Sequence, residues 1–489
     1  MTTVLHNVWS QLCYSPEEPL MFNSGLFWVL FVAFIAVYAL LKSRRTQMML
    51  FVTAFSLFFF YKSSGFTFLL LVATALIDWY LARRMAAATS PGWRKGWLLA
   101  ISLTCSIGLL AFFKYGNFLM WNFGALVGRN FHPLDLVLPV GISFYTFRTV
   151  SYVVDVYRGK LEPARNFLDY LFFLSFFPCL VAGPIVRADK FLPQLRANKP
   201  ATREMIWGGL WLVMLGLLKK AVFADYIAQY NNIAFGNPAG YSGVELLMAV
   251  LGYTMQIYCD FSGYSDMAIG LGAIMGFDLG INFDYPYRSL NVTMFWRRWH
   301  ISLSLWLRDY VYIGLGGNRK GRLRQLLNLM LTMLVGGLWH GASWNFIVWG
   351  AGHGAALCAH KLCMPWLKRV PDTRAVCFAS WLFTFVLVSF LWIFFRAENF
   401  TVAGQVISGV FTRFNCAYFP VFFKVRWLWC TMMLVIFALH FVPVRCYDRL
   451  RQWFIGAPWV VRLLVFMAVV QLVVYFATED VQPLIYGQF

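Results

Sequence analysis

Long apolar runs, separated by short polar turns, recur along most of this chain and restrict it to a membrane. Each run approaches the roughly 20 residues that an α-helix needs to cross a bilayer. Because lipid offers no hydrogen bonds to an exposed backbone, such runs cross as helices. The sequence therefore predicts an all-α polytopic membrane protein with about twelve transmembrane helices. The expected spans are 25–41, 48–61, 66–82, 97–113, 168–184, 206–229, 244–275, 326–339, 344–363, 376–396, 426–444 and 459–477.

The composition supports burial in lipid. Charged residues are 13% of the 489 residues, against roughly 25% in soluble globular domains. Lipid must therefore cover much of the surface, which excludes a soluble globule, a disordered chain and a coiled coil. The ten cysteines include no C-x-x-C pair and predict no disulfide framework. The first 24 residues lack Lys and Arg, so no cleavable signal peptide is expected.

The distribution of basic residues predicts the orientation of the chain, because Lys and Arg mark cytoplasmic turns. The turn Lys42–Arg45 is basic, the next turn has only Lys62, and the connection Arg83–Lys95 is basic again. No Lys or Arg follows Arg462. Both termini are therefore expected outside the cytoplasm, which requires an even number of crossings.

One loop, between Arg297 and Arg324, carries seven cations and one acid, a net +6 of the chain's net charge of +20. This loop alternates cations with aromatic residues and ends in the open sequence Gly314–Arg319. One interpretation is cytoplasmic topology with attraction to anionic membrane lipid. The other is a docking surface for a phosphorylated cytoplasmic ligand, because Arg binds phosphate through a planar, bidentate fork. The cations are Arg297, Arg298, Arg308, Arg319, Lys320, Arg322 and Arg324, with Asp309 as the single acid.

Two of the seven histidines are candidates for chemistry. His340 lies in an apolar run rich in small residues, and His300 lies beside the basic loop. An ionisable side chain at membrane depth is costly and is therefore a functional candidate. A neutral imidazole can accept a proton from a hydroxyl near pH 7. The alternative for either residue is a hydrogen-bonded core histidine.

Other polar groups inside apolar runs leave several interpretations open. The group His353, Cys358, His360 and Cys363 contains metal-ligand residue types, but its spacing matches no standard zinc site, and we predict no metal. Lys219, Lys220 and the acids of Asp260–Asp266 suit helix pairing or an ion path, so a transporter remains an alternative. No Gly-x-Ser-x-Gly elbow, Walker loop or dinucleotide-binding loop occurs.

An ordered series of segments resembles the membrane-bound O-acyltransferase family, in particular its bacterial alginate O-acetylation branch. The resemblance implies a ring of transmembrane helices around a thinned core, with funnels from both faces. It also implies an O-acyltransferase in the bacterial cytoplasmic (inner) membrane. The segments are Leu138–Phe147, Phe177–Pro184, Asp260–Gly270, Asn282–Tyr287, Trp296–Ser304, Trp306–Tyr310, Leu315–Arg319 and Leu338–Ala342.

The same resemblance divides the chain and assigns roles to residues. It implies N-terminal transmembrane helices over 1–135, a catalytic core over 136–364, and C-terminal helices with an extracytoplasmic tail over 365–489. The family's catalytic histidine corresponds to His340, and the second histidine of the branch corresponds to His300. A general base at His340 would activate an acceptor hydroxyl, while His300 or Asn318 would orient the reacting groups or stabilise the oxyanion.

Donor, acceptor and partners follow as expectations. The co-substrate would be acetyl-CoA or an acylated carrier protein, held by Arg297, Arg298, Arg308, Asn318 and Arg319, and no bound cofactor is expected. The tail Ile485–Phe489 suggests an acyl relay through Tyr486 to an extracytoplasmic SGNH-type acetyltransferase, or else an interfacial anchor. The product would be an O-acetylated polysaccharide such as alginate, or peptidoglycan, with no nucleic-acid partner. Alternatives are D-alanyl transfer to teichoic acid within the family, and a transporter or scaffold of a secretion complex.

Overall fold

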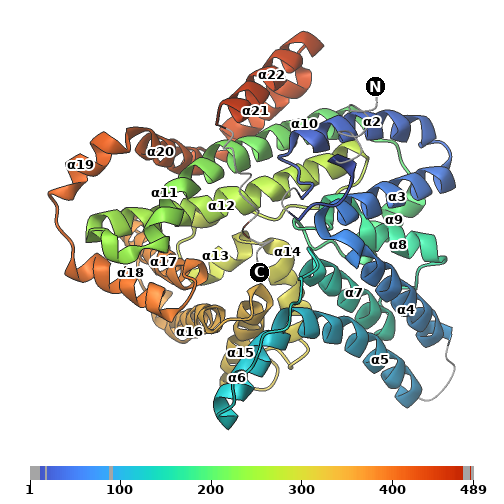
Figure 1. Ribbon diagram of the computed structural model, residues 1–489, viewed down its shortest axis with the longest axis horizontal. Coiled ribbons are helices and arrows are strands. Elements are labelled where there is room, and N and C mark those ends of the chain that lie inside the picture. Colours follow the sequence, from blue (N-terminus) through green and yellow to red (C-terminus); the bar gives the residue numbers. More distant parts are fainter. Residues whose placement is uncertain (1–10, 17–18, 88–91, 477–484, 486–489) are drawn as a thin grey trace. The chain divides into compact units, whose positions relative to one another are not determined.

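The computed structural model describes residues 11–16, 19–87, 92–476 and 485, and every regular element in these ranges is helical (Figure 1). The all-α expectation is therefore confirmed for the described residues. The chain forms two compact units. The first comprises Met1–Leu210 and Met267–Gly280, and the second comprises Trp211–Asp266 and Ile281–Phe489. The three segments predicted from sequence motifs, 1–135, 136–364 and 365–489, are a different kind of division, which these two units do not test.

The first unit is built around aromatic packing. The ring of Phe177 lies 5.5 Å from that of Phe34, 5.1 Å from Phe55 and 5.9 Å from Phe59, between ring centroids. Gly65 separates α3 from α4 with φ +61°, a conformation that L side chains rarely adopt. Its helices are α2 (Gly25–Leu41), α3 (Arg45–Ser64), α4 (Phe68–Ala87), α5 (Gly92–Leu110), α6 (Gly116–Val127), α7 (Ile142–Tyr157), α8 (Phe167–Ser175), α9 (Ala188–Ala197) and the first half of α10 (Arg203–Leu217).

Five helical stretches in the described ranges are long and apolar enough to cross a membrane. The number is six if α19 (Tyr418–Val425) and α20 (Trp427–Phe441), which are bent by 90° relative to one another, form one span. The 43-residue stretch Arg45–Ala87 contains two of the expected spans, 48–61 and 66–82. The helix expected over 168–184 ends at Ser175. A polytopic membrane chain is thus supported, and the total of about twelve crossings stays a prediction. The other stretches are Gly92–Val127, Arg203–Gly236, Arg374–Arg396 and Trp459–Phe476.

The second unit contains the candidate functional residues. Its helices are the end of α10, a π-helical turn η4 (Leu218–Ala224), α11 (Asp225–Gly236), most of α12 (Gly243–Ile274), α13 (Val292–Arg298), α14 (Ile301–Trp306), a π-helical turn η7 (Leu307–Tyr312), α15 (Arg322–His340), α16 (Trp344–Leu367), α17 (Arg374–Arg396), α18 (Phe400–Thr412), α19 (Tyr418–Val425), α20 (Trp427–Phe441), α21 (Val444–Gly456) and α22 (Trp459–Phe476).

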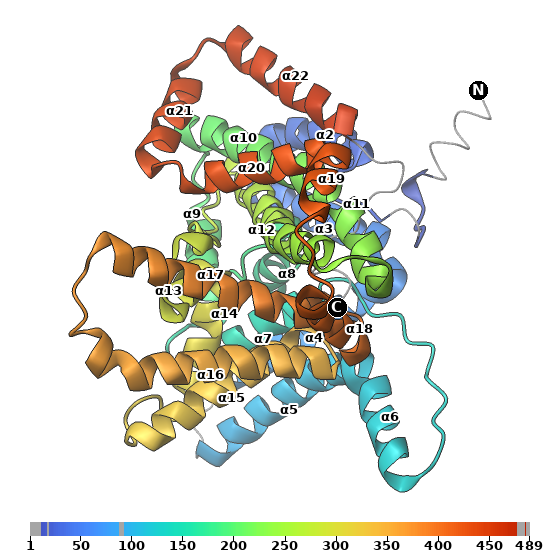
Figure 2. The same ribbon diagram turned by 90° about the vertical axis from the view of Figure 1, so that its left-hand side faces the viewer.

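Small residues bring α15 and α16 into close contact. A Cβ on Gly337 would collide with the carbonyl oxygen of Phe346, and one on Gly350 would lie 2.5 Å from the carbonyl oxygen of Met333. Helices in membranes associate through such small residues, because backbones can then approach closely. Figure 2 shows α15, α16 and α17 lying along one another. This packing fixes the end of α15, where His340 lies.

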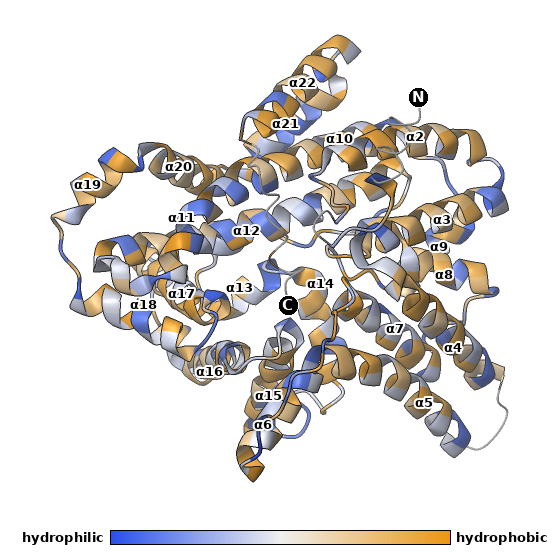
Figure 3. Cartoon of the chain, in the orientation of Figure 1, coloured by the Kyte–Doolittle hydropathy of each residue, from blue (hydrophilic) through white to orange (hydrophobic). Residues whose placement is uncertain are grey.

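The polar helix α21 separates two apolar helices, α20 and α22 (Figure 3). Arg445 and Arg449 of α21 are exposed. Arg462 of α22 is buried and donates hydrogen bonds to the carbonyl oxygens of Phe454 and Ile455 at the end of α21. The connection between the two apolar helices is therefore a basic, amphipathic helix, as an interfacial turn requires.

Candidate active site

His300 lies at a sharp turn between α13 and α14. Its backbone has φ +41°, in the left-handed region that few non-glycine residues adopt, and its side chain is fully buried. Such a conformation costs roughly 1–3 kcal/mol and persists only where surrounding contacts impose it. The amide N–H of Ile301, next in the chain, donates to the carbonyl oxygen of Asn282 at 2.9 Å. The turn is therefore held by a residue 18 positions earlier.

The side chain of Asn282 also fixes the imidazole of His300. Its Oδ1 accepts from the amide N–H of Ser302 at 3.2 Å and lies 3.1 Å from Nδ1 of His300. Its Nδ2 donates to Oγ of Ser265 at 3.0 Å. Because a backbone N–H can only donate, Oδ1 is an acceptor there, and Nδ1 of His300 must carry the proton. In the neutral ring the lone pair then lies on Nε2.

His340 is the last residue of α15 and is only 2% exposed. Aromatic rings enclose its imidazole on several sides. The centroid distances are 4.9 Å to Trp339, 4.9 Å to Trp349 and 5.0 Å to Phe395. A Cβ on the following Gly341 would collide with the ring of Phe346. The helix end is therefore packed against α16 and α17, and its histidine has a fixed, apolar surround.

The two predicted histidines meet at one indole. The ring of Trp339 lies 5.9 Å from that of His300 and 4.9 Å from that of His340. Trp339 is adjacent to His340 in the sequence, whereas His300 comes from the turn before α14. The structure thus brings together two buried imidazoles that are 40 residues apart in the chain. No pattern in the sequence predicts a role for Trp339 or Asn282 at this site.

Three further histidines of the second unit have hydrogen-bonding partners of their own. His353 is buried, and its Nδ1 accepts a hydrogen bond from the indole N–H of Trp296 at 3.3 Å. Nδ1 of His360 lies 2.9 Å from Oγ1 of Thr293. Nε2 of His440 accepts from the amide N–H of Tyr287 at 3.1 Å. In the described residues, no group of three or more His, Cys, Asp or Glu side chains is arranged to hold a metal ion.

The basic loop carries the predicted donor-binding residues in different environments. Arg297, Asn318 and Arg319 are exposed. Arg308 forms two bonds to Asp309, at 2.6 and 3.1 Å, which raise the pKa of the guanidinium. Arg298 lies 3.9 Å from Asp284. Arg308 is exposed as well, but its charge is already compensated by Asp309, so Arg297 and Arg319 are the stronger candidates for binding phosphate.

The end of this loop is an open backbone. Gly316 and Gly317 have φ +103° and φ +58°, and the carbonyl oxygen of Gly317 accepts from Nδ2 of Asn328 at 2.8 Å. Asn328 is buried in α15, so the loop is attached to the helix that ends in His340. Asn318 follows directly and is exposed, unlike the two histidines.

Acidic groups of α11 and α12 form ion pairs in the second unit, and those of Lys220 are buried. Nζ of Lys219 lies 2.7 Å from Asp266, and Nζ of Lys220 lies 2.7 Å from Asp225 and 2.6 Å from Asp260. Asp260 also accepts a hydrogen bond from the amide N–H of Ile485 at 3.0 Å. Tyr486, the predicted acyl relay, lies outside the described residues, but its neighbour Ile485 is described and buried.

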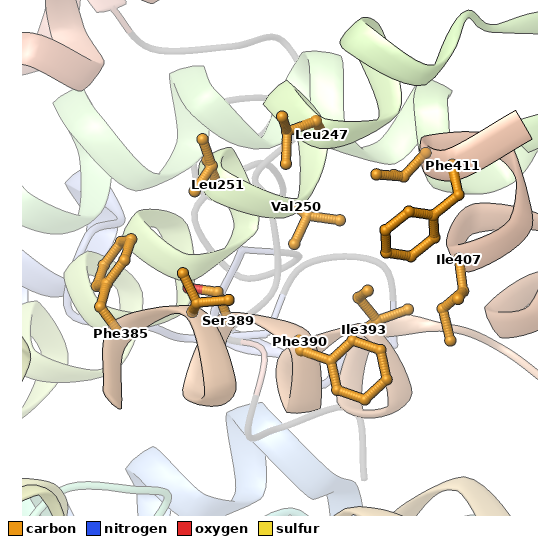
Figure 4. A pocket seen from close by; sticks show the side chains of 11 residues that line it. Leu247, Val250, Leu251, Phe385, Ser389, Phe390, Ile393, Ile407 and Phe411 are labelled. Atoms are coloured by element: carbon orange, nitrogen blue, oxygen red, sulfur yellow. The ribbon is translucent and has the colours of Figure 1, made fainter. Parts of the chain in front are cut away.

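A separate pocket in this unit is apolar. It lies between α12, α17 and α18, and Ser389 is the one polar side chain among its eleven lining residues (Figure 4). Leu247, Phe385 and Phe411 are among the others. Without an ionisable group, this pocket offers no acid–base chemistry.

These observations define the class of protein: a helical membrane protein with two buried histidines beside an exposed cationic loop. The chain belongs to the membrane-bound O-acyltransferase family, which it matches over residues 98–403. It is accordingly an O-acyltransferase, as the resemblance predicted.

Three curated relatives show the range of the family around this chain. It is 40% identical over 407 residues to the probable alginate O-acetylase AlgI of Pseudomonas putida, covering 80% of each chain. It is 36% identical over 421 residues to the peptidoglycan O-acetyltransferase of Helicobacter pylori, again covering 80% of each. A teichoic acid D-alanyltransferase of Bacillus subtilis is 28% identical over 346 residues, which cover 66% of this chain and 82% of the relative.

Proposed function

We propose that this protein takes an acetyl group from a cytoplasmic thioester and passes it across the bacterial inner membrane for O-acetylation of an extracytoplasmic polysaccharide. The single observation that carries the proposal is that the rings of His300 and His340 both contact the indole of Trp339, at centroid distances of 5.9 and 4.9 Å. The names of the relatives favour alginate, a similar exopolysaccharide or peptidoglycan as the final acceptor.

The transfer needs one general base for the acceptor hydroxyl. It also needs a hydrogen-bond donor for the negative charge that develops on the thioester carbonyl oxygen. His340 accepts the proton of an acceptor hydroxyl as its oxygen attacks the thioester carbonyl. The C–O bond forms, the C–S bond breaks, and the imidazolium returns the proton to the departing thiolate. His300, oriented by Asn282, accepts a hydrogen bond from the acceptor hydroxyl at Nε2 and so positions it. Asn318, whose side chain is exposed, is the candidate on sequence for stabilising the oxyanion.

The donor is acetyl-CoA or an acylated carrier protein, both of which carry phosphate at one end. Arg297, Arg298 and Arg319 would hold that phosphate, and Arg308 would add a weaker contribution because Asp309 compensates it. The attachment of the loop to α15 supports this assignment, since it couples the phosphate-binding end to the helix of His340.

The first acceptor of the acetyl group is Tyr486 in the carboxyl-terminal tail. Both termini lie outside the cytoplasm in this proposal. An SGNH-type acetyltransferase would then move the acetyl group from the tyrosine to the glycan. Ile485, the residue before Tyr486, is buried inside the second unit, which supports this relay because it draws the tail away from water.

Labelled acetyl donor tests the proposal directly. Purified protein in lipid nanodiscs is incubated with [¹⁴C]acetyl-CoA, and its tail peptide is analysed by mass spectrometry. The wild type should gain an acetyl group on Tyr486, and His340→Ala should not. An active enzyme with no acetylated tail peptide would show that the relay through Tyr486 is wrong. Acylation of the tail with a D-alanyl carrier protein as donor, and none with acetyl-CoA, would favour the teichoic acid branch.

A further inference from the structure

One ammonium and two carboxylates share a buried position between η4, α11 and α12. Nζ of Lys220 bonds to Oδ1 of Asp225 at 2.7 Å and to Oδ1 of Asp260 at 2.6 Å. The three residues are 1%, 7% and 2% exposed, respectively. A single cation therefore faces two anions away from water. Such an arrangement is stable only when the remaining carboxylate oxygens find further hydrogen-bond donors.

The carboxyl-terminal segment supplies one of those donors. The amide N–H of Ile485 donates to Oδ2 of Asp260 at 3.0 Å, and Ile485 itself is 8% exposed. Both oxygens of Asp260 are thus used: one by Lys220 and one by a peptide group 225 residues later. A hydrogen bond to an ionised acceptor is roughly twice as strong as one between neutral groups. The contact is therefore a specific attachment of the tail.

The same stretch of α12 reaches the histidine site. Phe261, next to Asp260, packs edge-on against His300 with ring centroids 4.7 Å apart. One turn later, Oγ of Ser265 accepts from Asn282, the residue that orients His300. Adjacent Cα atoms are about 3.8 Å apart. The attachment point of the tail is therefore one residue away from a direct contact of His300.

We propose that Asp260, held in place by Lys220, is a positioning residue that anchors the carboxyl-terminal segment at Ile485, on the stretch of α12 that also contacts His300. The consequence of this anchor for transfer through Tyr486 rests on the proposed acyl relay. The anchor at Ile485 does not, because it is a contact between described residues. Its chemistry is that of a fixed carboxylate recognising a backbone N–H, so the identity of the side chain at 485 is of secondary importance.

The chain offers a matched pair of variants for the test. Asp260→Ala and Asp225→Ala each remove one of the two carboxylates on Lys220 and leave a balanced, one-to-one ion pair. Only Asp260→Ala removes the acceptor of the Ile485 amide. Lys220 is left unchanged, because its loss would bury two uncompensated carboxylates. Asp260→Val, which fills part of the same space without an acceptor, serves if Asp260→Ala fails to fold.

Hydrogen exchange of the full-length protein in nanodiscs, read by mass spectrometry at residue resolution, measures the anchor. The Ile485 amide should be protected in the wild type and in Asp225→Ala. In Asp260→Ala it should exchange roughly 10–100-fold faster, the change expected for the loss of one hydrogen bond to a charged group. Acetylation of Tyr486 should fall in parallel in Asp260→Ala only.

The outcomes separate the anchor from the relay. Equal exchange of Ile485 in the wild type and in Asp260→Ala would overturn the anchor, whatever happens to activity. Faster exchange with unchanged transfer would overturn the positioning role. If the wild type protects Ile485 but never carries acetyl on Tyr486, the proposed relay fails while the anchor stands.

Discussion

Asn282 holds His300 in two ways at once. Its side-chain oxygen accepts a hydrogen bond from Nδ1 of the imidazole at 3.1 Å, and its backbone oxygen accepts from the amide N–H of Ile301. The first contact selects the tautomer, and the second stabilises the left-handed turn that contains the histidine. One residue therefore sets both the position and the protonation pattern of a candidate catalytic group.

Removing this acceptor should impair the transfer step. We expect Asn282→Ala to lower kcat about tenfold, because a lost buried hydrogen-bond partner costs ~1–3 kcal/mol and 1.4 kcal/mol is a factor of ten. The KM for acetyl-CoA should change less than kcat, since Asn282 contacts His300 and Ser302 rather than the arginines of the basic loop. Steady-state kinetics in nanodiscs measure both constants. Ser265→Ala, which removes only the contact to Nδ2, is the control and should have a smaller effect.

His340 should be required for acyl transfer. As a general base it contributes roughly 10²–10⁴-fold, so His340→Gln should lose that factor in kcat. His440→Gln is the matched control, because His440 is also buried but accepts from the backbone of Tyr287. This control should lower the Tm and retain activity per folded molecule. Equal activity of the two variants would remove His340 from the mechanism.

The helical class and the burial of both histidines were predictable from sequence, because apolar runs and ionisable groups among them are local signals. The contacts around the histidines were not. Asn282 and His300 are 18 residues apart, and no periodicity relates them. Trp339 is next to His340, but its contact with His300 depends on where the turn before α14 lies. Likewise, Asp260 and Ile485 meet only through the tertiary fold.

Span prediction was limited for a different reason. Hydropathy measures how apolar a segment is, and burial inside protein selects the same residues as burial in lipid. The run 168–184 is an example: its helix ends at Ser175, and Phe177 then packs among the rings of α2 and α3. Gly183, with φ +104°, follows in the same run. The apolar character of this segment reflects the interior of the first unit.

The contact between α15 and α16 should be sensitive to one methyl group. A Cβ on Gly337 would collide with a backbone oxygen, which cannot move without shifting a helix. A Cβ on Gly336 would meet only the end of the Leu307 side chain, at 3.2 Å. We expect Gly337→Ala to cost ~1–3 kcal/mol, as overpacking of a filled interface does, and Gly336→Ala to cost less. Thermal unfolding in detergent compares them, and equal Tm values would contradict the close approach.

The cations of the basic loop should contribute unequally to donor binding. Arg319 and Arg308 are both exposed, but Arg308 is bonded twice to Asp309. Arg319→Ala should raise the KM for acetyl-CoA by up to about fivefold, because an exposed ion pair contributes ~0.2–1 kcal/mol. Arg308→Ala should raise it less, since its charge is compensated before the donor binds. The difference should vanish at about 1 M salt, where the Debye length is about 3 Å. A larger effect of Arg308→Ala would mean that the donor displaces Asp309 and binds at this arginine.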